Sequence, residues 1–425
     1  MMENRFVKYV IKTLCLFLSL IILCLTAGCD RKEPNATSDP LETDIVSSVI
    51  SSTETSSEPA VVSTEVETTD APTTVPETEL PTEPFEPYIT YNEVGKAVIH
   101  VCGPADDRPS YLYQFDPYAM PSVYRMAYGD VVEEELRGFS DAILAGHDSF
   151  PCTGYDNWLH IRKMMRNVLP ISVYVKLGDT NEYDDSLLSD GRYPLTYTIP
   201  HKEYLSEVER FRERIAMLLA EADLREGDSD LEKAMKLYTS SSLRLVYDYS
   251  MDENDTEHQS AYRAIMGNTG ICKEIAGAYA YLLGQAGVDA AVCGGYMAAD
   301  HEPHGWTIVR IGEKWYHSDV TWQLRDPYQL TFFLHTDLRR KMYGVDLNSF
   351  DIGDCGQLRH DDLKMDDDTF TDLFWNVFWY TIDHRNNLLL YYDYFSTDLS
   401  DLSVFDSEPL QLVLPQIQTD PEMSD

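Results

Sequence analysis

Basic residues are scarce in this chain. Its 425 residues include 33 lysines and arginines against 72 aspartates and glutamates, a formal net charge of -39 at pH 7. Nucleic acids and anionic membrane surfaces carry charge of the same sign, so the excess argues against both as partners of the folded part. Acidic faces in contact with water are the simpler interpretation of this charge, ahead of a specific site for cations or for a basic partner.

Sequence patterns for metal ions are also missing. No calcium loop of the EF-hand kind occurs, and no two cysteines form a CxxC pair. His301 and His304 lack the HExxH spacing and the additional ligands of a zinc site. We therefore expect neither a metal nor a cofactor.

Long hydrophobic runs are rare, and the one at residues 14–25 is too short for a membrane-spanning helix. Three basic residues precede it, as in a secretory signal. The run ends in the sequence LTAGC at 25–29, which resembles the lipobox of bacterial lipoproteins, with Thr26 where leucine is commoner. The resemblance implies a lipoprotein signal peptide at 1–29 and lipidation of Cys29. An ordinary signal peptide or an uncleaved anchor is the alternative, and each implies export.

Aromatic residues are nearly absent from residues 30–87, which are rich in Ser, Thr, Glu, Pro and Val. Such a segment buries too little surface to offset its chain entropy, so we expect a disordered stalk. Residues 30–90 hold 14 acidic and 2 basic residues, a net charge of -12, and self-repulsion should extend them. A lipid-anchored protein with such a spacer fits the extracellular face of the cell membrane of a Gram-positive bacterium.

The folded part has an odd number of cysteines. Of eight in the chain, three belong to the export segment, which leaves Cys102, Cys152, Cys272, Cys293 and Cys355. In an exported protein an odd count leaves at least one thiol unpaired, which suits a reactive cysteine. The count does not show which thiol it is, or whether any disulfide forms.

Folding is expected to start near residue 88, with an N-terminal α+β region at 88–242. Apolar residues at helical or alternating spacing predict its elements, and we assign them to the core. We expect helices at 131–144, 157–168, 202–224 and, after a cap at Ser229, to about 241, and strands at 96–102, 171–176 and 193–199.

Cys272 is expected in the first turn of a buried helix. Gly270 interrupts the chain before it, apolar residues recur at helical spacing from Ile275 to Ala286, and Gly287 is placed to end the helix. The free N–H groups and the dipole at a helix start favour a thiolate, and they can receive a carbonyl oxygen as it becomes negative. The alternative is a small buried core cysteine.

Strands are expected at 288–296, 306–311 and 314–320, the last two joined by a type II′ turn at Gly312 and Glu313. This register places Trp306 opposite Asp319 and His304 opposite Thr321. Asp319 is then the diagonal neighbour of His304, within reach of a hydrogen bond that would orient the imidazole.

Other residues compete for these roles. His301 lies in an expected loop, and His317 shares the predicted face with His304. Asp300 could replace Asp319 by composition, although it precedes the strand and is less well placed. Position favours His304 and Asp319.

Three motifs resemble the transglutaminase-like superfamily: GIC at 270–272, HGW at 304–306 and DVTW at 319–322. The resemblance covers about 243–344, and the sequences YDY at 247–249 and SAY at 260–262 are also similar to exported bacterial members. It implies a papain-like α+β fold, in which a helix bearing the cysteine packs on an antiparallel sheet.

By this resemblance Cys272 is the nucleophile, His304 the base and acid, and Asp319 the residue that orients the imidazole. Many bacterial members have Gly and Tyr where this chain has Glu274 and Ile275, so the pocket beside the thiol is expected to be charged.

Donors for an oxyanion are less clear from the sequence. Tyr262 and Gln259 precede the cysteine at plausible distances, although packing or a surface position is the simpler interpretation of each. Trp306 and Trp322 are expected in the core or in the pocket wall.

The core domain is expected at 243–345 and a C-terminal extension at 346–425. Residues 346–367 are acidic and turn-rich, whereas 370–380 and 387–394 are rich in aromatics and are expected to form a hairpin or strands. Packing is a simpler role for these aromatics than a sugar-binding platform. The chain is expected to be loose from residue 416.

These observations predict a lipid-anchored surface enzyme that attacks an amide or peptide bond through a Cys272 thioester. Water as acceptor gives hydrolysis or deamidation, and an amine gives cross-linking. Peptides, proteins or cell-wall amides are the expected substrates, and hydrolysis is slightly preferred. One alternative is a surface binding module that has lost turnover, and another is a purely structural tether. Oligomeric state is left open.

Overall fold

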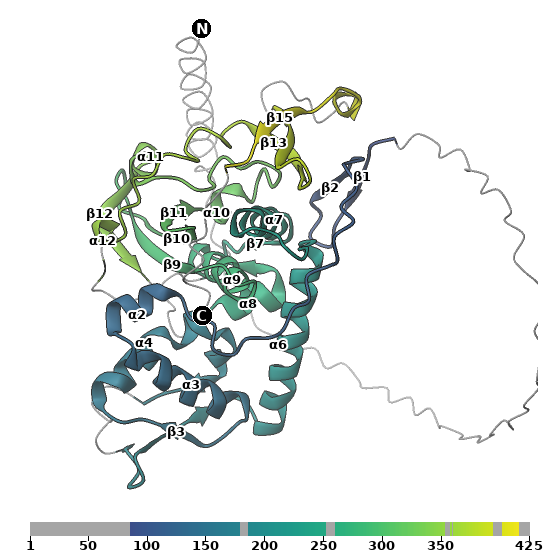
Figure 1. Cartoon of the computed structure of the whole chain (residues 1–425). Helices are drawn as coiled ribbons and strands as arrows, with labels where there is room; N and C mark the ends of the chain where they lie inside the picture. Colours follow the sequence, from purple (N-terminus) through teal and green to yellow (C-terminus); the bar gives the residue numbers. More distant parts are fainter. Residues whose placement is uncertain are drawn as a thin grey trace, which may run out of the picture. The chain divides into compact units, whose positions relative to one another are not determined.

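The structure, a computed structural model, describes residues 86–178, 186–251, 260–352, 358, 360–393 and 402–415. The expected signal peptide, almost all of the expected stalk, and Cys355 and Gln259 lie outside these residues. Within them, no helix is long and apolar enough to cross a membrane. Residues Leu80–Asp425 belong to one compact unit, and Figure 1 labels many of its elements.

A four-stranded antiparallel sheet lies at the centre of this unit, in the order β11-β10-β9-β12. The strands are β9 (Ala290–Met297), β10 (Pro303–Ile311), β11 (Lys314–Ser318) and β12 (Val345–Ile352). Ile311 pairs with Lys314, and Gly312 has a φ of 60°, as the first residue of a type II′ turn requires. The predicted hairpin and its register are confirmed.

The strand expected at 314–320 ends early, at Ser318. The side chain of Asp319 accepts a hydrogen bond from the backbone N–H of Trp322 at 3.3 Å and so caps the short helix α10 (Val320–Gln323). Strand alternation does not reveal this change, because an aspartate suits a cap and a polar strand position alike.

β12 extends the sheet into the region expected to be turn-rich. Leu347, Phe350 and Ile352 are buried although polar residues separate them, and the pairing with β9 is irregular between Asp346 and Asp351. The irregularity removes the simple alternation that marks a strand. The sheet therefore continues past residue 345.

Helix α9 (Cys272–Gln285) packs against β9 and β10 and is buried on almost every side. Gly277 permits close contact, since a Cβ there would lie 3.1 Å from the Cβ of Ala261. The helix ends as predicted at Gly287, with a φ of 80° and a backbone N–H that donates to the carbonyl of Gly284.

Helices α7 (Asp230–Arg244) and α8 (Ala261–Gly267) flank α9. The predicted cap of α7 is confirmed: the Ser229 hydroxyl accepts from the N–H of Glu232, and the Glu232 carboxylate accepts from the N–H of Ser229. Short strands β7 (Val246–Tyr247) and β8 (Thr269–Gly270) pair in parallel just before α9.

The N-terminal part is mainly helical. Its helices are α2 (Ser122–Tyr128), α3 (Val131–Leu144), α4 (Tyr155–Val168) and α6 (His201–Glu221). The last three match the predicted helices at 131–144, 157–168 and 202–224 to within three residues at each end. Short strand pairs accompany them: β1 (Tyr88–Tyr91) with β2 (Ala97–His100), and β3 (Ser149–Pro151) with β5 (Arg192–Pro194).

The strand predicted at 171–176 is wrong over most of its length. Residues Pro170–Tyr174 form a 3-10 helix, and only β4 (Val175–Lys176) is extended, paired with β6 (Thr196–Tyr197). Pro170 favours a helix start, and the buried Ser172 hydroxyl donates to the carbonyl of Met165 at 3.0 Å. These local interactions outweigh the apolar run that predicts a strand.

The C-terminal part adds helices α11 (Asp337–Met342) and α12 (His360–Leu363), a 3-10 helix at Leu402–Asp406, and a sheet of β13 (Val377–Asp383), β14 (Leu388–Asp393) and β15 (Leu410–Val413). The predicted hairpin is present, although β13 starts seven residues later than 370. Phe378, Trp379, Tyr392 and Phe405 are buried together in a small core. This placement supports packing rather than a sugar platform.

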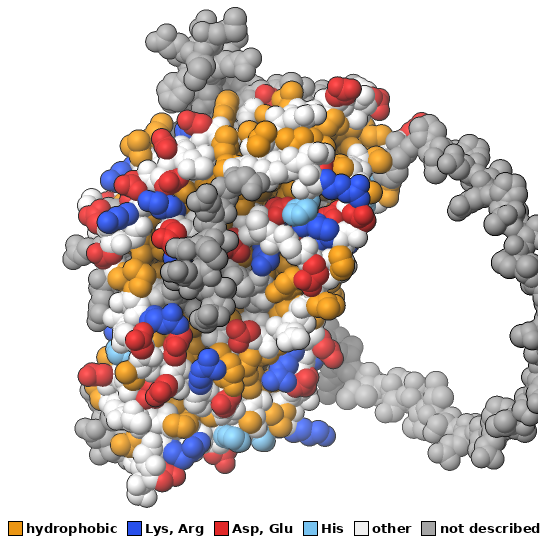
Figure 2. All heavy atoms as spheres, viewed as in Figure 1, with side chains coloured by type: hydrophobic (Ala, Val, Ile, Leu, Met, Phe, Trp, Pro, Cys, Tyr) orange, Lys and Arg blue, Asp and Glu red, His pale blue; other side chains and the backbone are white. Residues whose placement is uncertain are grey.

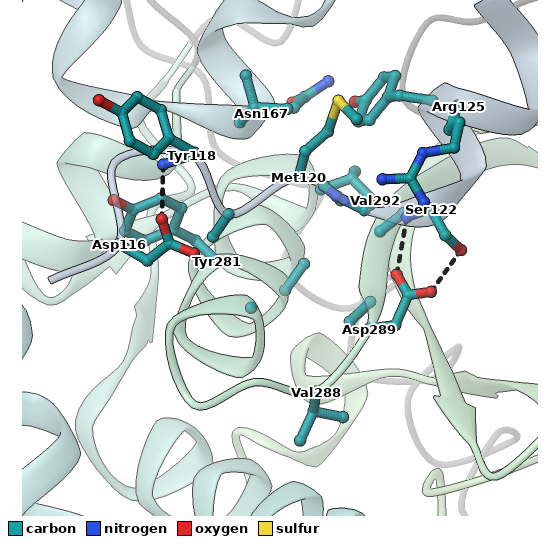
Figure 3. Close-up of a pocket in the computed structure, with 18 of the residues that line it drawn as sticks. Asp116, Tyr118, Met120, Ser122, Arg125, Asn167, Tyr281, Val288, Asp289 and Val292 are labelled. Carbon is teal, nitrogen blue, oxygen red and sulfur yellow. Dashed lines mark hydrogen bonds between the residues drawn. The ribbon is translucent and has the colours of Figure 1, made fainter. Parts of the chain in front are cut away.

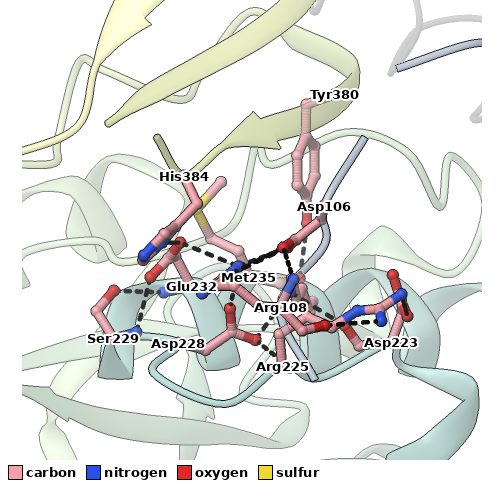
Figure 4. A network of polar contacts seen from close by, with 11 residues as sticks. Asp106, Arg108, Asp223, Arg225, Asp228, Ser229, Glu232, Met235, Tyr380 and His384 are labelled. Atoms are coloured by element: carbon pink, nitrogen blue, oxygen red, sulfur yellow. Dashed lines mark hydrogen bonds and ion pairs between the residues drawn. The ribbon is translucent and has the colours of Figure 1, made fainter. Parts of the chain in front are cut away.

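Charged contacts hold the chain before α2 and the β13–β14 turn to the start of α7 (Figure 4). Arg108 lies 2.9 Å from a carboxylate oxygen of Asp228, and Lys236 lies 2.8 Å from the other. His384 contacts Glu232 at 2.9 Å. Elsewhere, side chains of both signs are interspersed on the face shown in Figure 2.

Candidate active site

Cys272 is the first residue of α9, and 8% of its surface is exposed. The first N–H groups of a helix have no acceptor within it, so they and the positive end of the helix dipole lie beside this cysteine. The carboxylate of Glu274 accepts the N–H of Ile271 at 3.0 Å and closes the turn before the helix. The predicted position of the thiol at a helix start is therefore confirmed.

The expectation of a charged pocket from Glu274 and Ile275 is wrong. Both side chains are buried, and the Nε of Arg263 donates to both carboxylate oxygens of Glu274 at 3.1 Å. Arg263 also pairs with Asp248 at 2.5 Å. The charge of Glu274 is therefore paired with Arg263 inside the fold and stabilises the helix start.

His304 connects Cys272 with Asp319. Its Nε2 lies 2.7 Å from Oδ2 of Asp319, and Cys272 lies close enough to its imidazole to raise the pKa of that ring. Since Nε2 faces the carboxylate, Nδ1 is the nitrogen left for the sulfur. The ring of Trp322 stacks on the imidazole, with centroids 5.1 Å apart and planes 10° apart. The structure thus brings the three side chains into one series of contacts.

Charge at this site favours a protonated imidazole. Burial is the largest influence and lowers the pKa of His304, but the charge of Asp319, their hydrogen bond and the contact with Cys272 together raise it to about 9. Burial has the opposite effect on Asp319 and raises the pKa of its carboxyl. The charges of His304 and Arg340 outweigh this effect, so the pKa of Asp319 is lowered.

The residues that compete with His304 and Asp319 in the sequence make other contacts in the structure. His301 stacks on Tyr296 at 4.2 Å between ring centroids. His317 is fully buried, where it accepts from the indole N–H of Trp306 at 2.9 Å and contacts Asp337 at 2.9 Å. Asp300 is exposed and accepts the N–H of Glu302.

The two candidate oxyanion or pocket residues also use their donors in other contacts. The hydroxyl of Tyr262 donates to Glu207 at 2.6 Å, and its ring packs on Tyr174 and Phe211. The indole N–H of Trp306 donates to His317, and the residue is buried. Hydrogen bonds and ring packing within the fold therefore account for the contacts of Tyr262 and Trp306.

Gly305 brings the histidine strand close to the cysteine helix. A Cβ at this position would lie 3.0 Å from the Cα and 3.2 Å from the backbone nitrogen of Lys273, closer than folded chains permit without movement. Thr307 lies two residues after Gly305 on β10, and its hydroxyl donates to the backbone carbonyl of Ala276 at 2.9 Å. The absence of a side chain at Gly305 therefore sets the distance between the two elements.

Arg340 on α11 is the residue that sequence reasoning missed. It is fully buried, and its NH2 group donates to Oδ2 of Asp319 at 3.0 Å. No motif contains it, and it stands between two other basic residues, Arg339 and Lys341, in a short polar helix. Its burial depends on the tertiary packing of α11, so the sequence offered no signal for it.

A separate cavity lies at the other end of α9 (Figure 3). Its volume is about 290 Å³, and its wall includes Tyr281, Asp289 and Val292. The N–H of Ser122 donates to Asp289 at 3.0 Å and joins the start of α2 to this wall. Cys272, His304 and Asp319 do not line it.

The model of the transglutaminase-like superfamily matches residues 219–320. These residues form a transglutaminase-like domain, which contains Cys272, His304 and Asp319 and also includes α7, ahead of the start expected at 243.

Two solved structures are similar to parts of the chain. One, from Cytophaga hutchinsonii, is described as a "putative cysteine protease"; it is 15% identical, with 33% of this chain and 42% of that chain covered and a TM-score of 0.24. Another, described as a TGase, is 17% identical, with 34% and 38% covered and a TM-score of 0.24. The chain thus spans about two fifths of each. No curated protein matches it.

Proposed function

We propose that this protein is a cysteine-dependent enzyme that breaks amide or peptide bonds through a thioester on Cys272. The observation that carries the proposal is the series of contacts from Asp319 through His304 to Cys272, with 2.7 Å between the first two side chains. A thiol at a helix start beside a protonated imidazole has the surroundings of a reactive nucleophile. The match to the transglutaminase-like superfamily supports the same reading.

In the first step, the Cys272 sulfur attacks the carbonyl carbon of the amide and a C–S bond forms. Backbone N–H groups at the start of α9 are placed to stabilise the oxygen as it becomes negative. His304 gives its proton to the departing amine as the C–N bond breaks, which leaves a thioester.

In the second step, water or an amine attacks the thioester and transfers a proton to His304, and the Cys272 thiolate departs. Water gives hydrolysis of a peptide bond or deamidation of a side chain, and an amine gives a cross-link. Peptides, proteins and cell-wall amides are the proposed substrates, with hydrolysis preferred.

Mass spectrometry tests this proposal. Amide-containing peptides and cell-wall fragments are incubated with the protein, with Cys272→Ala and with Cys102→Ala as the matched control, since Cys102 is an exposed thiol. We expect a cleaved, deamidated or cross-linked product from the wild type and from Cys102→Ala, and none from Cys272→Ala. A wild type without any Cys272-dependent product would contradict the proposal.

A binding module that has lost turnover is the second candidate. The low exposure of Cys272 and of the His304 side chain, 8% and 9%, favours it. Alkylation by iodoacetamide at neutral pH separates the two candidates. An enzyme requires Cys272 to react faster than the exposed Cys102, and to lose this advantage in His304→Ala. Equal rates, unchanged by His304→Ala, would support the binding module.

We also propose that the protein is anchored by a lipid on Cys29 at the extracellular face of the cell membrane of a Gram-positive bacterium. The sequence LTAGC at 25–29 and the acidic, aromatic-poor segment 30–87 support this. Metabolic labelling with an alkyne-bearing fatty acid should mark the wild type but not Cys29→Ala. Equal labelling of the two would contradict the anchor.

A further inference from the structure

We propose that Arg340 is a positioning residue of the candidate site, which holds the Asp319 carboxylate in place and, through it, the imidazole of His304. The inference rests on the proposed function, because it assigns a task within the same site. Arg340 lies 21 positions after Asp319, on helix α11.

The position of the Arg340 side chain is set by two tryptophan rings. Its guanidinium carbon lies 4.7 Å from the ring centre of Trp306 and 4.5 Å from that of Trp322. A cation over an aromatic ring is stabilised by the ring quadrupole, and more so away from water. Among the described residues, Nε and NH1 have no hydrogen-bond partner, whereas NH2 donates to Asp319. The rings and one hydrogen bond therefore fix the group.

The carboxylate of Asp319 is held by groups from three elements. Oδ2 accepts hydrogen bonds from Nε2 of His304 on β10, at 2.7 Å, and from NH2 of Arg340 on α11, at 3.0 Å. Oδ1 receives the backbone N–H of Trp322 from α10, at 3.3 Å. Loss of Arg340 would leave a buried carboxylate with one cation in place of two, which is unfavourable and frees it to shift.

Trp322 gives Arg340 a second connection to the imidazole. The same indole ring that lies against the guanidinium also stacks on His304, with planes 10° apart. Arg340, Trp322 and His304 therefore form a continuous stack beside the hydrogen bonds. A change at Arg340 should disturb both the oxygen that orients His304 and the ring that packs on it.

Arg340 also contributes charge. The titratable and charged groups that meet here are Cys272 on α9, His304 on β10, Asp319 after β11 and Arg340 on α11. The next layer holds Tyr238 on α7, Cys293 on β9, His335 before α11 and Asp337 on α11. A fixed positive charge opposes the addition of a proton to the His304–Asp319 pair. Its removal should let the pair take up a proton at higher pH.

Nuclear magnetic resonance of the full chain with ring-labelled histidine tests both effects without a substrate. The variants are Arg340→Gln, which removes the charge, and Arg340→Lys, which keeps it. The matched control is Lys341→Gln, which removes the same charge from an exposed residue of the same helix. The titration midpoint of His304 reports charge, and the downfield resonance of its N–H toward Asp319 reports position.

We expect Arg340→Gln to raise the His304 midpoint by about one pH unit or more and to broaden the N–H resonance. Arg340→Lys should keep the midpoint near that of the wild type but broaden the resonance, and Lys341→Gln should change neither. A folded Arg340→Lys with the wild-type resonance would overturn the positioning role, whether or not Arg340→Gln folds. If no substrate is turned over, the proposed function fails while this test still decides the role of Arg340.

Discussion

At the scale of single residues, the candidate site depends on charges that are kept from water. Asp319 is fully buried, yet its neighbours His304 and Arg340 lower the pKa of its carboxyl below the usual value. In turn the carboxylate, with Cys272, raises the pKa of His304 to about 9. Each charge is stable only because the others are present, so a change to one should alter the rest.

The raised pKa of His304 predicts that stability depends on pH. Its folded-state pKa, about 9, lies above the ordinary value of 6.5, so its contribution is full below pH 6.5 and is lost as the pH rises through 9. We expect this to remove on the order of 3 kcal/mol from the free energy of unfolding. Urea unfolding across this range measures it. His304→Gln should lack this loss, and a parallel pH dependence of the two proteins would contradict the prediction.

Gly305 predicts a sensitive position beside the site. Gly305→Ala should push β10 away from the first turn of α9, because its Cβ would lie 3.0 Å from the Cα of Lys273. We expect a cost of about 1–3 kcal/mol in stability and about a 100-fold slower Cys272-dependent reaction. Gly294→Ala, on the paired position of β9, is the control, since its Cβ meets only ordinary contact at 3.6 Å. Equal rates for the two variants would refute the explanation.

The sequence revealed the parts of the site that depend on local order. The contact of His304 with Asp319 follows from a two-residue turn and strand pairing, both readable from spacing. Arg340 and Gly305 could not be assigned in this way. The position of Arg340 depends on how α11 packs on the sheet. The role of Gly305 depends on how closely β10 approaches α9.

At the scale of elements, capping and periodicity identified the long helices, while tertiary contacts decided the short segments. The amphipathic pattern of α6 and the cap of α7 were sufficient to predict both helices. The apolar run at 171–176 gave the wrong structure because a proline start and a buried serine favour a helical turn. The pairing of β12 with β9 is likewise set by packing and not by alternation.

The contacts at the start of α7 predict a stability effect. The Asp228 side chain has no exposed surface and contacts both Arg108 and Lys236, at 2.9 and 2.8 Å. Asp228→Asn should leave Lys236 without its carboxylate and Arg108 with one carboxylate fewer, since Arg108 also pairs with Asp106 at 2.7 Å. We expect it to lower the free energy of unfolding by about 3 kcal/mol. Thermal and urea unfolding measure the change. As a control, Asp223→Asn removes a 68% exposed carboxylate and should change stability by less than about 0.5 kcal/mol.

At the scale of the whole molecule, the expected regions 88–242, 243–345 and 346–425 lie within one compact unit. Helices of the first region contact α9, and β12 pairs with β9 beyond residue 345. Separate domains with their own cores would not share a sheet in this way. The unit should therefore unfold in a single transition.

A shortened chain that ends at residue 345 tests this expectation. It would lose β12 and expose the edge of β9 together with apolar residues of the core. We expect it to aggregate or to lack a cooperative thermal transition by circular dichroism, whereas a chain that ends at residue 415 should keep the transition. A stable, cooperatively folded chain ending at 345 would show that the boundary expected from the sequence is also a folding boundary.

The stacking of Trp322 on His304 has an optical consequence. A protonated imidazole against an indole ring quenches its fluorescence, whereas a neutral imidazole does so much less. Of the six tryptophans in the chain, Trp322 and Trp306 both stack on this histidine, with planes 10° and 26° apart. The contribution of Trp322 to the emission is the difference between the wild type and Trp322→Phe. We expect this contribution to increase as His304 loses its proton, so the fluorescence of Trp322 reports the charge of the imidazole next to Cys272.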